Sequence, residues 1–131
     1  MTKIMVVDDE DGMRFMIRKI LEREGYEVTE AGSGEECLEM LKHDKPDLIL
    51  LDVMMPGLDG WEVCKKIREN KESESITVAM LTVKSADEDK VKSFDEGLAD
   101  WHINKPFERE RLLKTVKWLL ESPLKRESPP E

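Results

Sequence analysis

Three acidic residues, a threonine and a lysine stand at the ends of short apolar runs, where strands are expected to finish. Asp8 and Asp9 follow the first run, and Asp52 follows the third. Thr82 lies near the end of the fourth, and Lys105 closes the fifth. Carboxylates that come together raise one another's pKa values, so such a cluster needs a cation. Mg²⁺ fits it, because Mg²⁺ prefers hard oxygen ligands and is often shared with a substrate phosphate.

The same five residues include the parts that phosphoryl transfer needs. That reaction requires a nucleophile held in line and neutralisation of the charge on the equatorial oxygens. A carboxylate can be the nucleophile and then forms an aspartyl phosphate. We predict this role for Asp52, because it ends the most apolar strand. Lys105 would supply a positive charge, and Thr82 would supply a hydroxyl for an anionic oxygen.

The elements that must position these residues are apolar strands and amphipathic helices in alternation. Strands are predicted over residues 3–7, 26–31, 47–51, 76–83 and 101–104, and helices over 11–24, 33–42, 61–69, 86–97 and 108–120. The helices have apolar side chains three and four residues apart, and residues 47–51 are apolar without alternation. Five βα units predict an α/β domain with a parallel sheet covered on both faces, with its ligand site at the carboxyl ends of the strands.

Length and charge restrict the class of protein. The chain of 131 residues has a formal charge of −9, which disfavours direct binding to nucleic acid or to an anionic membrane. It has no signal peptide and no apolar run that could span a bilayer, so we expect a cytoplasmic protein. One domain is expected over residues 1–121, and a disordered tail or the start of a linker over 122–131. Cys37 and Cys64 occupy apolar helix positions and are expected to be reduced core residues.

The motifs around these residues resemble those of the response-regulator receiver family, the CheY-like domains. They are VVDDE at 6–10, LLDVMMPGLDG at 50–60, LT at 81–82 and NKPF at 104–107. Each motif alone is weak, but together they occur in the family's order and spacing across nearly the whole chain. The resemblance implies a single-domain, doubly wound, flavodoxin-like parallel sheet with strand order 2-1-3-4-5.

The resemblance also implies a function for each residue. Asp52 would accept a phosphoryl group from a sensor histidine kinase, and Lys105 would contact that group. Asp9, Asp52 and the backbone carbonyl of Met54 would ligate Mg²⁺, with Asp8 acting through a water molecule. Thr82 would then move to bond the phosphoryl group.

Movement of the threonine would change the face formed by the fourth helix, fifth strand and fifth helix. That face would meet a downstream protein or a covalently linked output domain, and a homodimer formed on phosphorylation is left open. The chain would be a regulatory domain and not an enzyme in the usual sense, although it would promote its own phosphorylation and dephosphorylation.

Four positions depart from the family's usual pattern. His102 stands where the fifth strand usually carries Tyr or Phe, either as a switch side chain or as a partly exposed surface residue. Trp101 beside it is core filler or part of a binding face. Val83 replaces the usual Ala or Gly and should slow small phosphodonors, which Val83→Ala would test. Met54 orients an attacking water poorly, which favours a long-lived phosphate.

Other interpretations remain beside this one. The acids at 8 and 9 are also suited to the start of a helix, and Asp52 to a turn before Pro56. A pseudo-receiver that only docks partners would keep the fold without the chemistry. A haloacid-dehalogenase-type phosphatase would carry a second Asp where this chain has Met54. A flavodoxin-like cofactor binder would need a phosphate-binding loop after the first strand. The sequence leaves open the kinase, the output and whether the chain is part of a longer protein.

Overall fold

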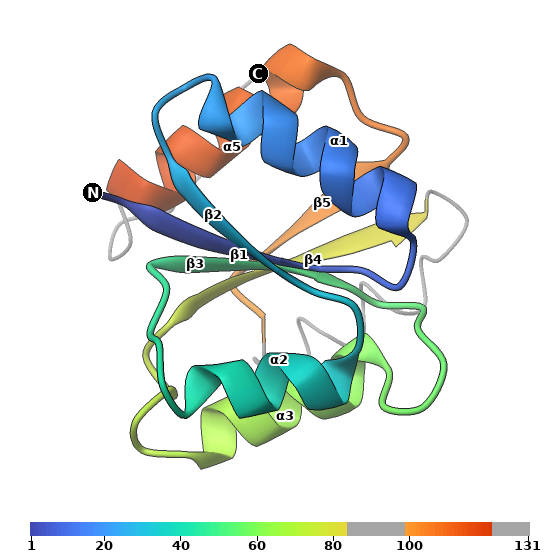
Figure 1. The fold of residues 1–131 in the computed structure, drawn as a ribbon, viewed down its shortest axis with the longest axis vertical. Helices are drawn as coiled ribbons and strands as arrows, with labels where there is room; N and C mark the ends of the chain where they lie inside the picture. Colours follow the sequence, from blue (N-terminus) through green and yellow to red (C-terminus); the bar gives the residue numbers. More distant parts are fainter. Residues whose placement is uncertain (84–98, 122–131) are drawn as a thin grey trace.

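Five parallel strands form one sheet in the computed structural model, which describes residues 1–83 and 99–121 (Figure 1). The strand order is β2-β1-β3-β4-β5, which confirms the expected order. The bounds are β1 (Lys3–Val7), β2 (Glu27–Ala31), β3 (Leu48–Asp52), β4 (Thr77–Val83) and β5 (Trp101–Lys105). The helix predicted over 86–97 and the tail predicted over 122–131 lie outside the described residues.

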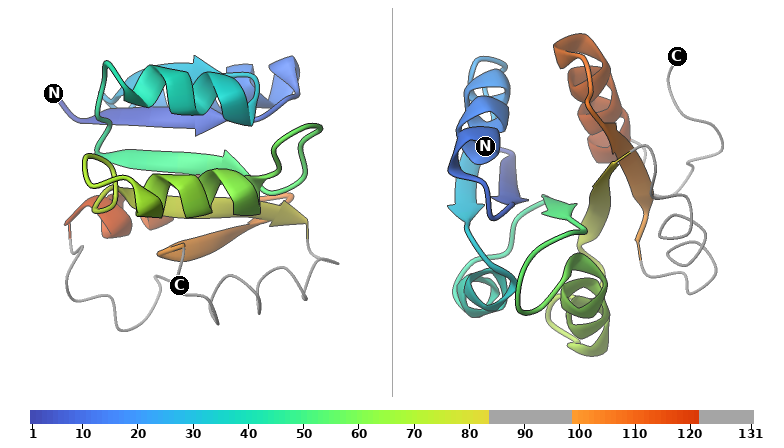
Figure 2. Two further views of the ribbon diagram at one scale, coloured as in Figure 1. Left: turned by 90° about the horizontal axis from the view of Figure 1, so that it is seen from below. Right: turned by 90° about the vertical axis from the view of Figure 1, so that its right-hand side faces the viewer.

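Within the described residues, helices cover both faces of the sheet, two on each (Figure 2). They are α1 (Asp11–Glu22) and α5 (Arg109–Glu121) on one face, and α2 (Gly34–Leu41) and α3 (Gly60–Glu69) on the other. Alternate residues of β1 point into opposite cores: Ile4 packs toward α1 and α5, and Met5 toward α2 and α3. Every residue of β3 is buried, as its continuous apolar run predicts. The central strands are therefore rigidly held, and their carboxyl ends have fixed positions.

Polar side chains cap the starts of α2 and α3. The hydroxyl of Ser33 accepts a hydrogen bond from the backbone N–H of Glu36, as expected for the cap at this position. Asp59 and Glu62 form a reciprocal capping box at the start of α3. This cap fixes the end of the loop that follows Asp52.

Helix α1 ends at Glu22, two residues before the predicted end. Gly25 has a φ of 93°, and the N–H of the next residue, Tyr26, bonds the carbonyl of Leu21. This is a Schellman-type ending, and it requires the left-handed conformation that glycine adopts without strain. Gly25 therefore ends the helix. The turn that it closes includes the two residues before it, so the regular helix stops at Glu22.

An arginine and an aspartate tie elements together at the amino edge of the sheet. Arg68, near the end of α3, donates to the carbonyls of Glu74 (2.8 Å) and Ile76 (2.7 Å) and to the carboxylate of Asp100 (2.9 Å). The same oxygen of Asp100 accepts the N–H of Val78 in β4 at 2.8 Å. This contact set links α3 to the first residues of β4 and β5, and no sequence pattern predicted it.

Trp101, whose role the sequence left open, packs against the core, and the two cysteines lie within it. Trp101 is half-buried and meets Trp118 of α5 edge to face, with ring centroids 5.2 Å apart, which favours the core-filler interpretation. Cys37 and Cys64 are buried free thiols, as predicted. Burial raises the pKa of Cys37 to about 12 and that of Cys64 to about 11, so both stay protonated at neutral pH.

Among the described helices, none is both long and apolar enough to cross a bilayer.

Candidate functional site

The carboxyl ends of the strands bring three of the predicted acids together. Residues Val7 and Leu51 are partners in the pairing of β1 with β3, so Asp8 follows one strand directly beside Asp52 at the end of the other. Asp8, Asp9 and Asp52 each offer a carboxylate oxygen, and these oxygens lie within 4.8 Å of one another. The sheet order alone therefore builds the predicted cluster.

Lys105 is the cation that compensates part of this charge. Its ammonium group donates to Asp8 Oδ2 at 3.0 Å and to Asp52 Oδ1 at 3.2 Å. Burial lowers the pKa of Lys105, but its hydrogen bond to Asp8 and the attraction of Asp52 outweigh burial and raise that pKa overall. Lys105 therefore stays charged and bridges Asp8 and Asp52, and the contact with a phosphoryl group stays a prediction.

Asp52 is held in an environment that disfavours its negative charge. The residue is 6% exposed, and burial, with a smaller contribution from the charge of Asp8, raises the pKa of its carboxyl to about 6. Lys105 opposes this shift, and so does the N–H of Met54, which lies 3.4 Å from Asp52 Oδ1. A further cation at the cluster would stabilise the ionised, nucleophilic form.

The donor set fits Mg²⁺. Every side-chain ligand atom in the cluster is a carboxylate oxygen, and among the described residues three carboxylates share one ammonium group, which bonds Asp8 and Asp52. Asp9 is the exposed member, while Asp8 and Asp52 are buried. Both oxygens of Asp8 already accept hydrogen bonds, from Lys105 and from the N–H of Glu10. That arrangement suits the indirect, water-mediated role predicted for Asp8.

Comparison with known proteins decides the family. Residues 4–117 match the model of the response regulator receiver domain. The chain belongs to the response-regulator receiver family. It is 46% identical to the transcriptional regulatory protein ResD of Bacillus subtilis over 91% of this chain and 48% of that protein. It is 45% identical to the PhoP regulator of alkaline phosphatase synthesis of B. subtilis over 90% of this chain and 48% of that protein.

The fold of the receiver matches solved structures as well. The chemotaxis protein CheY4 of Vibrio cholerae superposes with a TM-score of 0.83 at 35% identity, covering 89% of this chain and 97% of that one. The chain spans about half the length of the curated relatives it matches. Both the family and the CheY-like fold predicted from the sequence motifs are confirmed, and the chain is a two-component receiver domain.

Two of the predicted residues lie outside the acidic cluster of the receiver. Thr82 is buried in β4, and its hydroxyl donates to the carbonyl of Val83 at 3.0 Å. His102 is half-buried in β5 beside Met80, so it lies on the same face of the sheet as Thr82 and further from the carboxyl edge. The switch roles given to these two side chains stay predictions.

Two apolar side chains are exposed at the same edge. Val83 ends β4 as the pairing partner of Lys105 and is 41% exposed. Met54 follows Asp52 by two residues and is 66% exposed. The restriction of small phosphodonors by Val83 and the slow loss of phosphate associated with Met54 both stay predictions.

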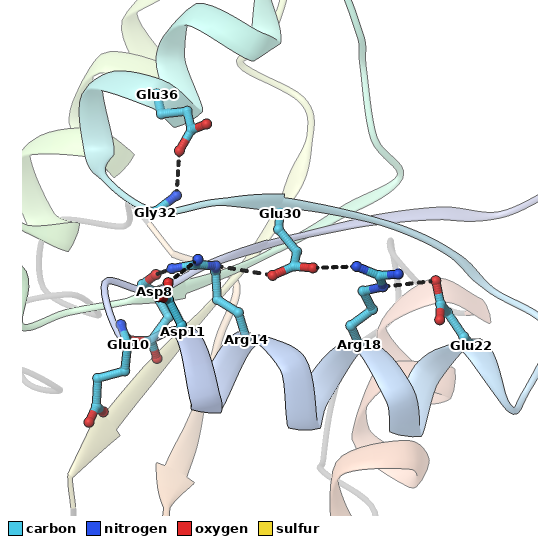
Figure 3. A network of polar contacts seen from close by, with 9 residues as sticks. All are labelled: Asp8, Glu10, Asp11, Arg14, Arg18, Glu22, Glu30, Gly32 and Glu36. Carbon is cyan, nitrogen blue, oxygen red and sulfur yellow. Dashed lines mark hydrogen bonds and ion pairs between the residues drawn. The ribbon is translucent and has the colours of Figure 1, made fainter.

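Sequence reasoning missed Arg14 of α1. Its guanidinium donates to the backbone carbonyl of Asp8 and to two carboxylates (Figure 3). The arginine lies six residues after Asp8, on a helix with several charged positions, and no local pattern separates it from a solvent-exposed charge. Its contact with Glu30 of β2 depends on the docking of α1 against the sheet, and that docking is a tertiary feature.

Proposed function

We propose that this receiver accepts a phosphoryl group on Asp52 from a sensor histidine kinase, in a reaction that depends on Mg²⁺. The observation that supports the proposal is the Asp52 carboxylate, gathered with Asp8 and Asp9 and bonded by the ammonium of Lys105. An oxygen of Asp52 attacks the phosphorus of a phosphohistidine. The new P–O bond forms as the P–N bond breaks, and the imidazole nitrogen of the kinase takes up a proton.

The surrounding residues divide the remaining work. When bound, Mg²⁺ supplies positive charge to the phosphoryl oxygens. Asp9, Asp52 and the carbonyl of Met54 hold it, with Asp8 acting through water. Lys105 is within hydrogen-bond distance of Asp52, so a short shift of its ammonium brings it to a phosphoryl oxygen. The hydroxyl of Thr82 exchanges its bond with the Val83 carbonyl for one with the phosphoryl group.

The signal leaves through a protein partner. We assign this role to the face that carries β5 and α5, where His102 of β5 would act as a second switch side chain. The helix predicted over 86–97 lies outside the described residues. The partner is a downstream protein or a covalently linked output domain. The relatives that are named transcriptional regulators favour a linked domain, because the chain spans about half of their length. A homodimer formed on phosphorylation would use the same face. We propose no direct contact between this domain and nucleic acid. We place its action in the cytoplasm.

Intact-mass spectrometry after incubation with an acyl phosphate, with and without Mg²⁺, tests the phosphoacceptor. Wild type should gain one phosphoryl group when Mg²⁺ is present, and Asp52→Asn should gain none. Asp47→Asn is a matched control, because this carboxylate lies at the opposite edge of the sheet, where it accepts the N–H of Lys3. An adduct that persists in Asp52→Asn would contradict the assignment.

Access to Asp52 decides how a negative result is interpreted. If wild type takes no phosphoryl group from the small donor, Val83→Ala should do so, because the smaller side chain widens the approach. Failure of that variant, and of wild type with a panel of phosphorylated histidine kinases, would favour the docking pseudo-receiver.

A further inference from the structure

Asp9 is the exposed ligand of the cluster, and its carboxylate receives no hydrogen bond within residues 1–83 and 99–121. The side chain is therefore aimed mainly by the backbone that carries it. Two peptide groups flank its Cα atom: one joins Asp8 to Asp9, and the other joins Asp9 to Glu10. Whatever holds these two planes sets the direction in which the carboxylate points.

Both planes are held by side chains. The carbonyl of the first plane, that of Asp8, accepts a hydrogen bond of 2.6 Å from Nη1 of Arg14. The N–H of the second plane, that of Glu10, donates to Oδ1 of Asp8 at 2.9 Å. Asp8 itself is fixed to β2 through its own N–H, which bonds the carbonyl of Ala31 at 3.2 Å. Arg14 is thus one of two groups that orient the backbone around Asp9.

The guanidinium of Arg14 is fixed from three directions (Figure 3). Besides the Asp8 carbonyl, Nε donates to Glu30 at 3.1 Å and Nη2 pairs with Asp11. The other oxygen of Glu30 accepts a hydrogen bond of 2.8 Å from Arg18, whose side chain is 40% exposed and, among the described residues, makes no hydrogen bond with Asp8 or Asp9. The side chain of Arg14 is 16% exposed. A planar fork with donors on all three nitrogens can make these contacts together, whereas an ammonium group cannot.

We propose that Arg14 is a positioning residue for the divalent cation: it holds the Asp8–Asp9 peptide so that Asp9 faces the metal. The inference rests on the proposed Mg²⁺ site. For the affinity of the site for a cation, a positioning role and simple charge repulsion predict changes of opposite sign when Arg14 is removed. Arg14 is a positive group beside a cation site, so on electrostatics its removal should strengthen cation binding. Removal of a positioning group should weaken it, and partners behind metal ligands typically matter by a factor of ten or more.

Binding of Mn²⁺, used in place of Mg²⁺ and followed by the EPR signal of the free ion, separates these effects. Arg14→Lys keeps the charge and loses the fork, and we expect about tenfold weaker Mn²⁺ binding. Arg14→Gln should also bind more weakly, against the direction of electrostatics. Arg18→Lys is the matched control, because it is the same substitution at the other arginine bonded to Glu30, and it should bind as wild type does.

A second variant tests the proposal without a change of charge and with little risk to the fold. A Cβ added at Gly32 would lie 3.3 Å from Nη1 of Arg14, close enough to displace the guanidinium by a few tenths of an ångström. Gly32→Ala should weaken Mn²⁺ binding about threefold, a smaller effect than removal of the fork.

Each outcome of these titrations has a definite meaning. Wild-type affinity in both Arg14→Lys and Gly32→Ala, or tighter binding by Arg14→Gln, overturns the role of Arg14 and leaves the metal site standing. Equal losses in Arg14→Lys and Arg18→Lys overturn it as well. A wild-type protein that takes up no Mn²⁺ overturns the proposed metal site and the role of Arg14 together.

Discussion

Two clusters of charged side chains lie at opposite edges of the sheet, and they differ in how well their charges are balanced. At the amino edge, Arg68 and Asp100 pair with each other and with backbone groups of neighbouring elements. At the carboxyl edge, the described residues place three carboxylates together, and the ammonium of Lys105 bonds two of them. Arg68 and Asp100 balance each other's charge, whereas the described charges of the carboxylate cluster have a negative excess.

This difference separates a structural ion pair from a binding site. Matched charges with backbone partners stabilise the fold, because each desolvated group recovers the interactions that it loses with water. Burial, with a smaller contribution from the charge of Asp8, raises the pKa of Asp52, so the metal-free fold holds a carboxyl group whose negative charge is disfavoured. A bound cation would remove this cost. We therefore expect substitutions at the two edges to change stability with opposite signs.

The largest effect is expected at the amino edge. Asp100→Ala removes the acceptor shared by Arg68 and the N–H of Val78, and it should lower the free energy of unfolding by about 3 kcal/mol. Urea denaturation measures this change. The control is Lys42→Ala, which breaks an exposed pair with Glu39 and should leave stability nearly unchanged. Equal urea midpoints for Asp100→Ala and Lys42→Ala would show that the contacts of Asp100 do not stabilise the fold.

The next effect has the opposite sign and lies at the carboxyl edge. In EDTA at pH 7, Asp52→Asn should raise the free energy of unfolding by about 2 kcal/mol, because it removes a buried charge whose pKa is raised to about 6. The lost contact with Lys105 offsets part of the gain. The same denaturation experiment measures it, and a variant less stable than wild type would mean that the cluster is already balanced without a metal.

The smallest effect is the pH dependence of that difference. The folded pKa of Asp52, about 6, lies above its ordinary value of 3.8, so between these values the folded state binds more protons than the unfolded state. Stability due to this group therefore falls as pH rises from 4 to 6 and then levels off. Between pH 5 and pH 7, metal-free wild type should lose about 1 kcal/mol relative to Asp52→Asn. A constant difference across that range would show that the pKa of Asp52 is not raised.

Local patterns in the sequence were enough to predict most of the elements. Each of the four described helices and five described strands was expected, with ends that differ by at most a few residues. Capping by Ser33 and the turn at Gly25 were predictable, because both depend on residues within one turn of the helix end. The gathering of Asp8, Asp9 and Asp52 followed from strand order, which the family's motifs implied.

The residues that the sequence did not reveal act over long separations. Asp100 binds Arg68 across 32 positions, and Arg14 binds Glu30 across 16. Charged residues are common on helix surfaces, edge strands and loops, so nothing in the local pattern marks these as half-buried residues that connect elements.

The sequence by itself determined where the acids stand and at which edge of the sheet they meet, because the period of apolar residues sets the strands and the strands end at those acids. The tertiary structure decided how each carboxylate is aimed and how strongly its charge is opposed. Those properties depend on the distance to Lys105, on the burial of Asp52 and on the contact of Arg14 with the Asp8 carbonyl. Hydrogen bonds and Coulomb interactions change steeply over an ångström, and only the packing of α1 and β5 against the central strands sets distances to that precision.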